Sequence, residues 1–300
     1  HLKRLIKPRR VQPPLALTGG SGRVVPEPLG VVLIIAPWNY PFHLLFRPLV
    51  GAVAAGNCAV LKPSEQAPAC SLASHELVKK TFPEEHVALV EGGPEIAARL
   101  LEENFDGIFF TGGPRQGRAV MEAAARTLTP VILELGGKSP CIIDREVDLK
   151  LCARRIAWGK FLNAGQTCVA PDYILADRRI KAPLLEEMKR CIADFYGARP
   201  LKSPDYPRII NELHFDRLLG LMDRGTIVCG GDSDRGNCRI APTVIENVDW
   251  ADPIMQEEIF GPLLPVMEFE ELDQAVEMVN ARPKPLALYI FSRDQRAIER

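Results

Sequence analysis

The feature that most constrains the fold of this chain is a regular alternation of short apolar runs with amphipathic segments, which begins near Gly30. Short apolar runs bounded by turn residues are typical of buried strands, and apolar residues spaced three and four apart are typical of helices that cover a sheet. A strand, a helix and a second strand in sequence imply a right-handed crossover between parallel strands. The sequence therefore predicts an α/β fold with a mostly parallel sheet covered by helices on both faces.

The patterns place the expected elements along most of the chain. The expected strands are 30–36, 58–61, 86–90, 107–110, 131–135, 140–143, 173–176 and 286–291. The expected helices are 48–55, 72–78, 95–101, 118–125, 149–161, 182–195 and 272–279. The longest uncharged run, 28–46, is interrupted by prolines and polar residues, so we interpret it as a strand, a turn and the start of a helix rather than a membrane helix.

Length and composition suggest two domains of an ordinary reduced protein. A chain of 300 residues is typical of two domains, and the glycine pair Gly136 and Gly137 predicts the boundary near 134–137. Lys and Arg total 37 against 38 Asp and Glu, which argues against a nucleic-acid partner bound through bulk charge. No two of the eight cysteines are closer than nine residues. That spacing indicates neither a metal site nor a disulfide framework, so we expect a cytoplasmic protein without a metal.

Cys168 is the cysteine whose surroundings favour chemistry. It lies in the segment NAGQTCVAPD, residues 163–172, directly after the helix expected over 149–161. The glycine, the small residues and the proline around it predict an irregular backbone that presents the sulfur to a cleft and turns its own N–H toward a developing oxyanion. The alternative is a buried structural thiol. That alternative fits the cysteines inside apolar or helical patterns, which are Cys58, Cys141, Cys152 and Cys191.

Two polar residues follow or end predicted strands. Glu134 lies near the carboxyl end of the strand expected over 131–135, where open α/β sheets bind ligands, and a partly desolvated carboxylate there is suited to act as a general base. Asn39 lies in the proline-stiffened turn PWNYP, and a fixed amide can donate a hydrogen bond to an oxyanion. A salt-bridged or capping Glu134 and an ordinary turn Asn39 are the alternatives.

Three further segments have features of a cofactor site. Lys62 and Glu65, in KPSE, follow a strand and could meet paired ribose hydroxyls, and the charge of Glu65 would oppose a 2′-phosphate. The glycine turn 111–117 opens a helix after a strand, as expected for phosphate binding, although it is not a GxGxxG fingerprint. Glu258 and Phe260, in EEIFGP, could meet a sugar and a planar ring. Turn formation and solvated acids are the respective alternatives.

Taken together, the motifs of this chain resemble the aldehyde dehydrogenase superfamily. They occur in the family's order and approximate spacing as PWNYP (37–41), KPSE (62–65), ELGGKSP (134–140), GQTC (165–168) and EEIFGP (257–262). The segments GQTCVAPDY and MQEEIFGP most resemble its class 3, or fatty-aldehyde-type, branch. The similarity runs from about Pro28 to the end of the chain. It implies a Rossmann-like NAD(P)-binding domain over 1–135 and an α/β catalytic domain over 136–300.

The resemblance implies a role for each matching residue. Cys168 would be the nucleophile that attacks the aldehyde, Asn39 and the Cys168 N–H would hold the oxyanion, and Glu134 would activate the water that hydrolyses a thioester. NAD or NADP would accept the hydride. Lys62 and Glu65 would bind the adenine-side ribose, while Glu258 and Phe260 would position the nicotinamide ribose and ring. The remaining positions on the cofactor side would be Trp38, Thr111, Gly112, Gly113, Gly117, Leu135 and Gly136.

The resemblance also implies a substrate class and an assembly. We expect a medium- or long-chain aliphatic or an aromatic aldehyde, and a homodimer. Gly113 and Gln116 stand where the family usually has Ser and often Val, which leaves the choice between NAD and NADP open. The N-terminal part of the cofactor domain and the C-terminal part of the family's chain are expected to be absent. The latter sometimes carries a membrane anchor, although this chain has no membrane segment of its own.

Two other interpretations use the same residues. A cofactor-independent thiol esterase or acyltransferase would need Cys168, Asn39 and Glu134 alone, but KPSE and EEIFGP have no task in simple acyl transfer. A non-catalytic remnant that serves as an interaction module is suggested by the two absent ends. An intact cleft in a well-folded protein would argue against it.

Overall fold

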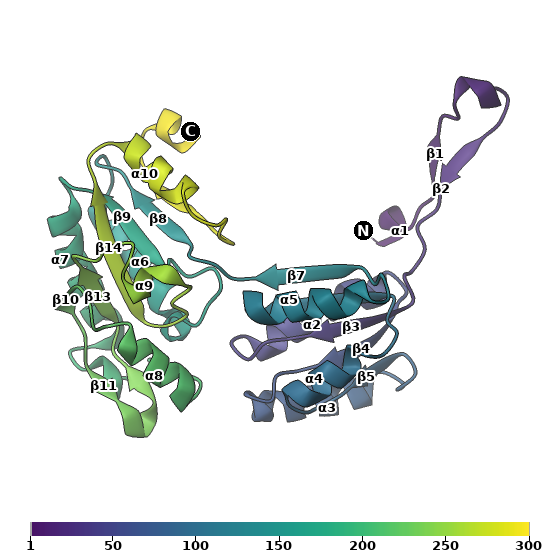
Figure 1. Ribbon diagram of the computed structural model, residues 1–300, viewed down its shortest axis with the longest axis horizontal. Helices are drawn as coiled ribbons and strands as arrows, with labels where there is room; N and C mark the ends of the chain where they lie inside the picture. Colours follow the sequence, from purple (N-terminus) through teal and green to yellow (C-terminus); the bar gives the residue numbers. More distant parts are fainter. Residues whose placement is uncertain (1, 300) are drawn as a thin grey trace. The chain divides into compact units, whose positions relative to one another are not determined.

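The computed structural model of this chain describes residues 2–299. The chain divides into two compact units, His1–Leu135 and Gly136–Arg300 (Figure 1). Each unit has its own sheet and its own apolar cores.

The first unit is built on a five-stranded parallel sheet with the order β5-β4-β3-β6-β7. Its strands are β3 (Val31–Ile35), β4 (Cys58–Lys62), β5 (Val87–Leu89), β6 (Gly107–Gly112) and β7 (Val131–Leu135). The chain moves outward from β3 to β5 and then returns to the other side of β3. This is the doubly wound order, and ligands bind such sheets where the order reverses, here between the carboxyl ends of β3 and β6.

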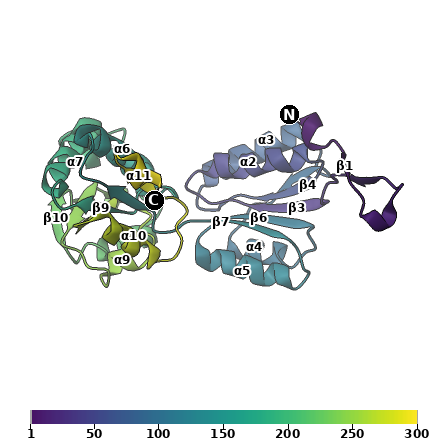
Figure 2. The same cartoon turned by 90° about the horizontal axis from the view of Figure 1, so that it is seen from above.

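Helices cover both faces of this sheet (Figure 2). The helices α2 (Pro41–Ala54) and α3 (Pro68–Thr81) pack on one face, and α4 (Pro94–Leu100) and α5 (Pro114–Ala125) pack on the other. Alternate residues of β3 enter the two cores, because successive side chains of a strand point to opposite faces. Each of the four helices begins with a proline, which tolerates the first helical position because it lacks the N–H that would be unpaired there.

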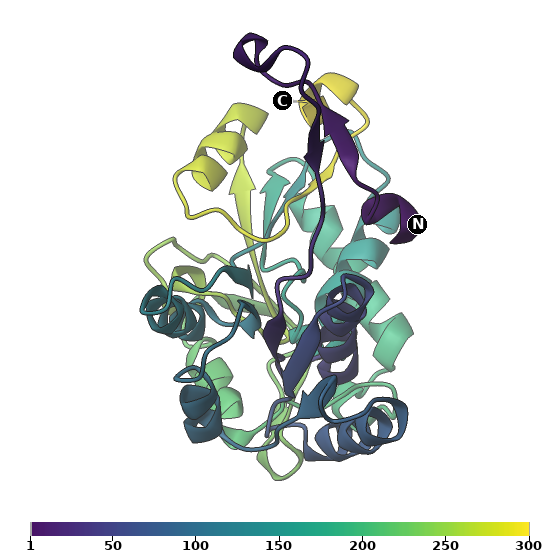
Figure 3. The ribbon, with the colours of Figure 1, turned by 90° about the vertical axis from the view of Figure 1, so that its right-hand side faces the viewer.

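A short antiparallel hairpin precedes the sheet of the first unit. It consists of β1 (Arg9–Val11) and β2 (Gly22–Val24), follows α1 (Leu2–Leu5), and encloses a 3₁₀ turn at Leu15–Leu17. The hairpin extends away from the parallel sheet of its own unit (Figure 3). No helix or strand was expected in this segment.

The second unit has a six-stranded sheet with the order β10-β13-β14-β9-β8-β15. Its strands are β8 (Pro140–Ile143), β9 (Tyr173–Asp177), β10 (Thr226–Cys229), β13 (Thr243–Glu246), β14 (Leu263–Phe269) and β15 (Tyr289–Phe291). Neighbouring strands are parallel except for the edge pair β10 and β13. A separate small hairpin joins β11 (Ser233–Asp234) to β12 (Arg239–Ile240).

Two cores flank the sheet of the second unit. On one face, α6 (Leu149–Phe161) and α7 (Lys181–Tyr196) bury residues such as Ile156 and Leu184. On the other face, α8 (Glu212–Gly220), α9 (Pro253–Gln256) and α10 (Leu272–Asn280) bury residues such as Phe215 and Ile254. A last helix, α11, spans Gln295–Glu299. Within residues 2–299, no helix combines the length and the apolar character needed to cross a membrane.

The predicted fold class is confirmed, but several expected elements were wrong in extent. The helix expected to begin at Pro48 begins at Pro41 and continues through Pro48, and the helix expected from Arg118 begins at Pro114. The strand expected over 286–291 is confined to Tyr289–Phe291. No element was expected between 197 and 271, where the structure has β13 and β14. Pro265 lies inside β14 even though proline is unusual in a central strand.

Candidate active site

The polar residues predicted from the first unit lie along one edge of its sheet. Asn39 follows the carboxyl end of β3, and Lys62 is the last residue of β4. In the strand register, Ile35 of β3 pairs with both Lys62 and Phe110, so β3 and β4 end level with each other and β6 continues two residues further, to Gly112. The order of the sheet reverses between β3 and β6. This edge is therefore the ligand-binding crevice expected of a doubly wound sheet.

Lys62 is buried at this edge and held by two acceptors. Its Nζ donates to the carbonyl oxygen of Pro63 at 2.7 Å and lies 3.6 Å from Oε2 of Glu65. Burial lowers the pKa of Lys62, and the nearby carboxylate of Glu65 partly opposes this effect. The strand end thus offers an ammonium and an exposed carboxylate side by side, which is the donor and acceptor set that paired hydroxyls require.

The glycine turn after β6 leads directly into α5. Gly113 is the N-cap residue, so the positive end of the helix faces the turn. Two other glycines lie close to neighbouring side chains. A Cβ on Gly112 would lie 2.6 Å from the ring of Phe110, and a Cβ on Gly117 would lie 2.8 Å from the side chain of Leu135. For Gly117 and Leu135, which were predicted on the cofactor side, the structure gives a role in packing α5 on β7.

Glu134 differs from the sequence-based expectation. It lies in β7 opposite Thr111 of β6, as a residue at this edge should, but its side chain is exposed. The expectation that Glu134 is partly desolvated is therefore wrong. The reason is the alternation of β7, in which Ile132 and Glu134 point to the open side of the strand. Trp38 and Asn39, in the turn after β3, are half-buried.

In the second unit, Cys168 follows a strained piece of backbone. Asn163, Ala164 and Gly165 have consecutive positive φ angles of 53°, 52° and 73°. Residues other than glycine rarely adopt this conformation, and it persists where the surroundings hold it. Cys168 itself is half-buried, in a turn closed by a hydrogen bond from the N–H of Ala170 to the carbonyl oxygen of Thr167.

The buried side chain of Gln166 holds this loop in place. Its Nε2 donates to the carbonyl oxygens of Asn163 at 3.0 Å and Arg208 at 3.1 Å. Its Oε1 accepts from the N–H of Ile210 at 2.9 Å. Gln166 therefore ties the loop before Cys168 both to itself and to the segment that precedes α8.

Several other thiols are poorly suited to act as nucleophiles. Burial raises the pKa of Cys141, and it raises the pKa of Cys152 to about 11. Burial also raises the pKa of Cys191 and of Cys229. The thiolate is the nucleophilic form, so these four cysteines are protonated and inert near neutral pH.

The loop that carries Glu258 and Phe260 lies against the Cys168 loop. A Cβ on Gly165 would lie 2.1 Å from the carbonyl oxygen of Gly261, so only glycine permits this approach. Phe260 has a positive φ of 49°, which makes this second loop strained as well. A Cβ on Gly136 would lie 2.2 Å from Oε2 of Glu258. Parts of the motifs ELGGKSP, GQTC and EEIFGP thus meet within the second unit.

Glu258 and its neighbour Glu257 have opposite surroundings. Burial raises the pKa of Glu258 to about 7, whereas the N–H of Gly137, which donates to the carboxylate, lowers it. The charge of Asp172 raises this pKa further, and Lys160 and Lys138 lower it. Glu257 has a side chain that is 65% exposed. Of the two adjacent acids, Glu258 is the one that can act inside the protein.

Lys160 is a second buried group of unusual character in this unit. It is 1% exposed, and burial lowers its pKa to about 8. The charge of Asp172 raises that pKa, the charge of Lys138 lowers it, and Glu258 raises it. Lys138, Lys160, Asp172 and Glu258 therefore form one electrostatically coupled cluster.

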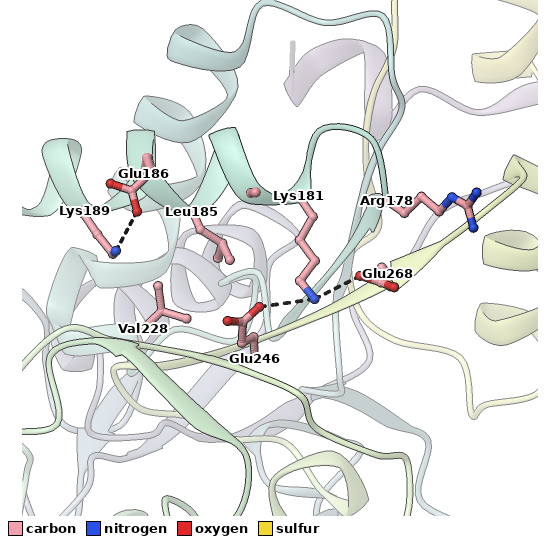
Figure 4. A pocket seen from close by; sticks show the side chains of 9 residues that line it. Arg178, Lys181, Leu185, Glu186, Lys189, Val228, Glu246 and Glu268 are labelled. Carbon is pink, nitrogen blue, oxygen red and sulfur yellow. Dashed lines mark hydrogen bonds and ion pairs between the residues drawn. The ribbon is translucent and has the colours of Figure 1, made fainter.

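A hollow of about 380 Å³ elsewhere in the second unit holds none of the predicted site residues. Figure 4 shows its lining side chains, among which Lys181 lies 3.2 Å from Glu246 and 3.0 Å from Glu268. Lys189 pairs with Glu186 at 2.6 Å. The lysines of this hollow already have acidic partners, so it offers no net charge to a ligand. Among residues 2–299, no cluster of His, Cys, Asp and Glu could hold a metal ion.

The sequence matches the model of the aldehyde dehydrogenase family over residues 6–300. The chain belongs to the aldehyde dehydrogenase family. It is 49% identical over 298 residues to aldehyde dehydrogenase family 3 member B2 of Mus musculus, covering 99% of this chain and 62% of that relative. It is 49% identical over 274 residues to the dimeric NADP-preferring aldehyde dehydrogenase of Rattus norvegicus, covering 91% of this chain and 60% of that relative.

A solved aldehyde dehydrogenase has the same fold. The substrate-bound AldH of Staphylococcus aureus superposes with a TM-score of 0.95 and 45% identity, covering 99% of this chain and 66% of that one. This chain spans about three fifths of the length of the two relatives above. The resemblance to the aldehyde dehydrogenase superfamily and to its class 3 branch is confirmed.

The family motifs fall into two groups when each unit is considered by itself. In the first unit, Asn39, Lys62, Thr111 and Glu134 share the carboxyl edge of the sheet. In the second unit, the loops of Cys168 and Glu258 are in contact through Gly165 and Gly261. Sequence reasoning missed three charged residues, Lys138, Lys160 and Asp172. The sequence contains a signal for two of them, which is a single charge in an otherwise uncharged segment. Lys138 directly follows the glycine pair, and Asp172 lies four residues after Cys168.

Proposed function

We propose that this chain provides the catalytic machinery of an NAD- or NADP-dependent aldehyde dehydrogenase that oxidises an aldehyde to a carboxylic acid. The observation that carries the proposal is the half-buried Cys168, set in a strained loop that lies against the loop of Glu258 and Phe260. Membership of the aldehyde dehydrogenase family supports the same chemistry. In this proposal, the first unit binds the cofactor and the second unit provides the nucleophile.

The chemistry begins at the sulfur of Cys168. Its thiolate adds to the carbonyl carbon of the aldehyde, and the carbonyl π electrons move to the oxygen. The side-chain amide of Asn39 and the backbone N–H of Cys168 donate hydrogen bonds to that oxyanion. When bound, the nicotinamide cofactor supplies the hydride acceptor for the oxidation. The chain then holds the acyl group as a thioester on Cys168.

Hydrolysis of the thioester is the task of Glu134. Its exposed carboxylate takes a proton from a water molecule, whose oxygen attacks the acyl carbon. The carbon–sulfur bond breaks, the carboxylic acid leaves, and the thiolate of Cys168 is restored. The exposure of Glu134 favours this role, because a general base must reach water.

The residues present fit a dinucleotide. The buried Lys62 beside Glu65 supports binding of the adenine-side ribose, and the start of α5 after Gly113 supports binding of phosphate. Glu258 and Phe260 would hold the nicotinamide ribose and ring. The other positions proposed on this side are Trp38, Thr111, Gly112, Gly117, Leu135 and Gly136.

The substrate, assembly and location are also proposals. The class 3 resemblance favours a medium- or long-chain aliphatic or an aromatic aldehyde. A homodimer is supported by one relative, which is named a dimeric enzyme. A cytoplasmic location is supported by the cysteines, since all eight are free thiols in the structure.

The test is a comparison of wild-type and Cys168→Ala proteins at full length. Each is mixed with NAD or NADP and a medium-chain aldehyde, and reduced cofactor is followed by its absorbance. We expect the substitution to lower turnover by at least about 10³-fold, because no other group can carry the acyl intermediate. Cys229→Ala, which removes another half-buried thiol of the same unit, is the control and should retain activity.

Three outcomes would contradict the proposal. One is cleavage of an activated ester without any reduction of cofactor, which would indicate the thiol esterase or acyltransferase. Another is a well-folded wild-type protein that is inactive in both assays, which would indicate an interaction module. The third is a Cys168→Ala protein as active as the wild type.

A further inference from the structure

We propose that Lys138 and Asp172 are positioning residues that fix the loop of Glu258 and Phe260, and thereby the nicotinamide end of the cofactor. The inference rests on the proposed function. Neither residue is assigned to substrate or cofactor, and both act through the loop that they hold. The evidence is a set of hydrogen bonds that join one ion pair to two backbone groups of the loop and to one of α9, which precedes it.

Lys138 uses each of its donors on a different acceptor. An ammonium group has three N–H donors. Here Nζ donates to Oδ2 of Asp172, to the carbonyl oxygen of Ile254 at 2.8 Å and to the carbonyl oxygen of Glu257 at 3.0 Å. The last two acceptors belong to α9 and to the residue that directly precedes Glu258. Lys138 therefore holds the loop on the N-terminal side of Glu258.

Asp172 holds the same loop on the C-terminal side of Glu258. Its Oδ1 accepts from the N–H of Ile259 at 2.8 Å, while Oδ2 accepts from Lys138. Its own N–H donates to the carbonyl oxygen of Ser139 at 2.8 Å. The side chains of Lys138 and Asp172 are only 16% and 4% exposed. Glu258 is thus bracketed by contacts at residues 257 and 259 that lead back to one charge pair.

The glycines before Lys138 contact Glu258 directly. The N–H of Gly137 donates to its carboxylate, and Gly136 lies so close to Oε2 that a Cβ at that position would displace the carboxylate. One segment, 136–138, therefore contacts the functional carboxylate and also tethers the backbone around it. A shift of the loop would move Glu258 away from this segment and Phe260 with it.

The Cys168 loop has a separate support. Gln166 fixes it through Asn163, Arg208 and Ile210, and none of these bonds involves Lys138. Ile254 and Ile259 are also fully buried in the core, so loss of the ion pair should displace the loop rather than release it. The positioning role can therefore be separated by experiment from the reactivity of Cys168.

The experiment uses Lys138→Met in the full-length protein and measures two quantities. The first is kcat/KM for the cofactor, which should fall by about 10²-fold, because a misplacement of about 1 Å has an effect of that size. The second is the rate at which iodoacetamide alkylates Cys168 without cofactor, followed by mass spectrometry. It should change by less than about threefold, since the hydrogen bonds of Gln166 that hold the Cys168 loop are intact. Lys138→Arg keeps the charge and should lose less activity than Lys138→Met.

Folding is controlled by two further variants. Lys138→Met leaves the buried Asp172 without its cation, a change that can strongly destabilise a protein. If that variant does not fold, the double variant Lys138→Met with Asp172→Asn removes both charges and is expected to show the same split between the two quantities. Lys189→Met, which breaks the ion pair with Glu186 on α7, is the matched control and should change neither quantity.

The outcomes separate this inference from the proposed function. An active wild type with an unchanged Lys138→Met variant would overturn the inference and leave the dehydrogenase proposal intact. An equal loss of cofactor-dependent turnover and of Cys168 alkylation would also overturn it, because that result indicates general damage to the unit. A wild type that never reduces cofactor would overturn the proposed function itself, and this inference with it.

Discussion

Two acidic residues that the sequence places near the chemistry have very different surroundings in the two units. Glu134 lies at an open sheet edge of the first unit and is exposed, with only its strand partners to define its place. Glu258 lies in a loop of the second unit, where the N–H of Gly137 donates to it and burial raises its pKa to about 7. One carboxylate is open to water, whereas the other is held by its neighbours.

This difference suggests a division of tasks. A base that activates water needs access to water and a negative charge, and Glu134 has the necessary exposure. A residue that positions a ligand needs a fixed side chain, and the contacts of Glu258 provide one. Substitution of Glu134 should therefore change the steady-state rate of the reaction. Substitution of Glu258 should change how the free energy of unfolding depends on pH.

Glu134→Gln should have the largest effect. We expect the steady-state rate to fall by about 10³-fold, within the range for loss of a general base, provided that thioester hydrolysis is limiting. A first burst of reduced cofactor should remain, because the steps before the thioester do not need Glu134. Rapid-mixing measurement of reduced cofactor separates the burst from the later cycles.

Two results would contradict the role proposed for Glu134. An unchanged steady-state rate would remove Glu134 from the role of base. A loss of unfolding free energy well beyond about 0.5 kcal/mol would show that this exposed side chain is structural after all, because surface substitutions rarely exceed that value.

Glu258→Gln should change the pH dependence of stability. The ordinary pKa of 4.5 is raised to about 7 in the folded protein. The folded state then binds the proton more tightly than the unfolded state, so this group's contribution is fully present below about pH 4.5 and is lost as the pH rises to about 7. The difference corresponds to about 3 kcal/mol without solvent screening, and contact with water reduces it to about 2 kcal/mol. The glutamine variant lacks this contribution.

Urea unfolding of both proteins at about pH 5 and about pH 8 tests this prediction. Relative to the wild type, Glu258→Gln should gain stability between the lower and the higher pH. The charged groups facing Glu258 are Asp172, Lys160 and Lys138, so the difference between the two proteins reports the carboxyl group together with its coupling to these groups. A difference that does not change with pH would show that Glu258 titrates like an exposed acid.

The sequence predicted the sheet of the first unit better than that of the second. In the first unit, the apolar run 30–36 contains the observed strand β3, because a central parallel strand covered on both faces is apolar along its length. In the second unit, β13 has only four residues and β14 contains Pro265, so neither has a clear strand pattern. Helix starts were missed at Pro41 and Pro114, where proline suggested a turn but occupies the first helical turn.

The motifs of the proposed site could be recognised in the sequence, but the surroundings of their residues could not. Cys168, Glu134 and Glu258 stand in segments with a clear pattern, and the family match covers them. The exposure of Glu134 and the burial of Glu258 depend on which side of a strand or loop each side chain takes. The role of Lys138 depends on contacts with residues more than a hundred positions away. No local pattern encodes such contacts, so sequence reasoning could not find them.

A third acid, Glu65, lies between these two cases and should give the smallest effect. It is exposed like Glu134, but Oε2 lies 3.6 Å from the buried Nζ of Lys62. Its negative charge would oppose a 2′-phosphate on the adenine-side ribose. Glu65→Gln should therefore raise the ratio of kcat/KM for NADP to that for NAD by about threefold, the size expected for one exposed charge.

Initial rates with each cofactor measure this ratio. The matched control is Glu76→Gln, which changes an exposed acid paired with Lys80 on α3. An unchanged ratio in Glu65→Gln would place the adenine-side ribose away from KPSE, whereas a change of the same size in the control would attribute the effect to net charge rather than to position.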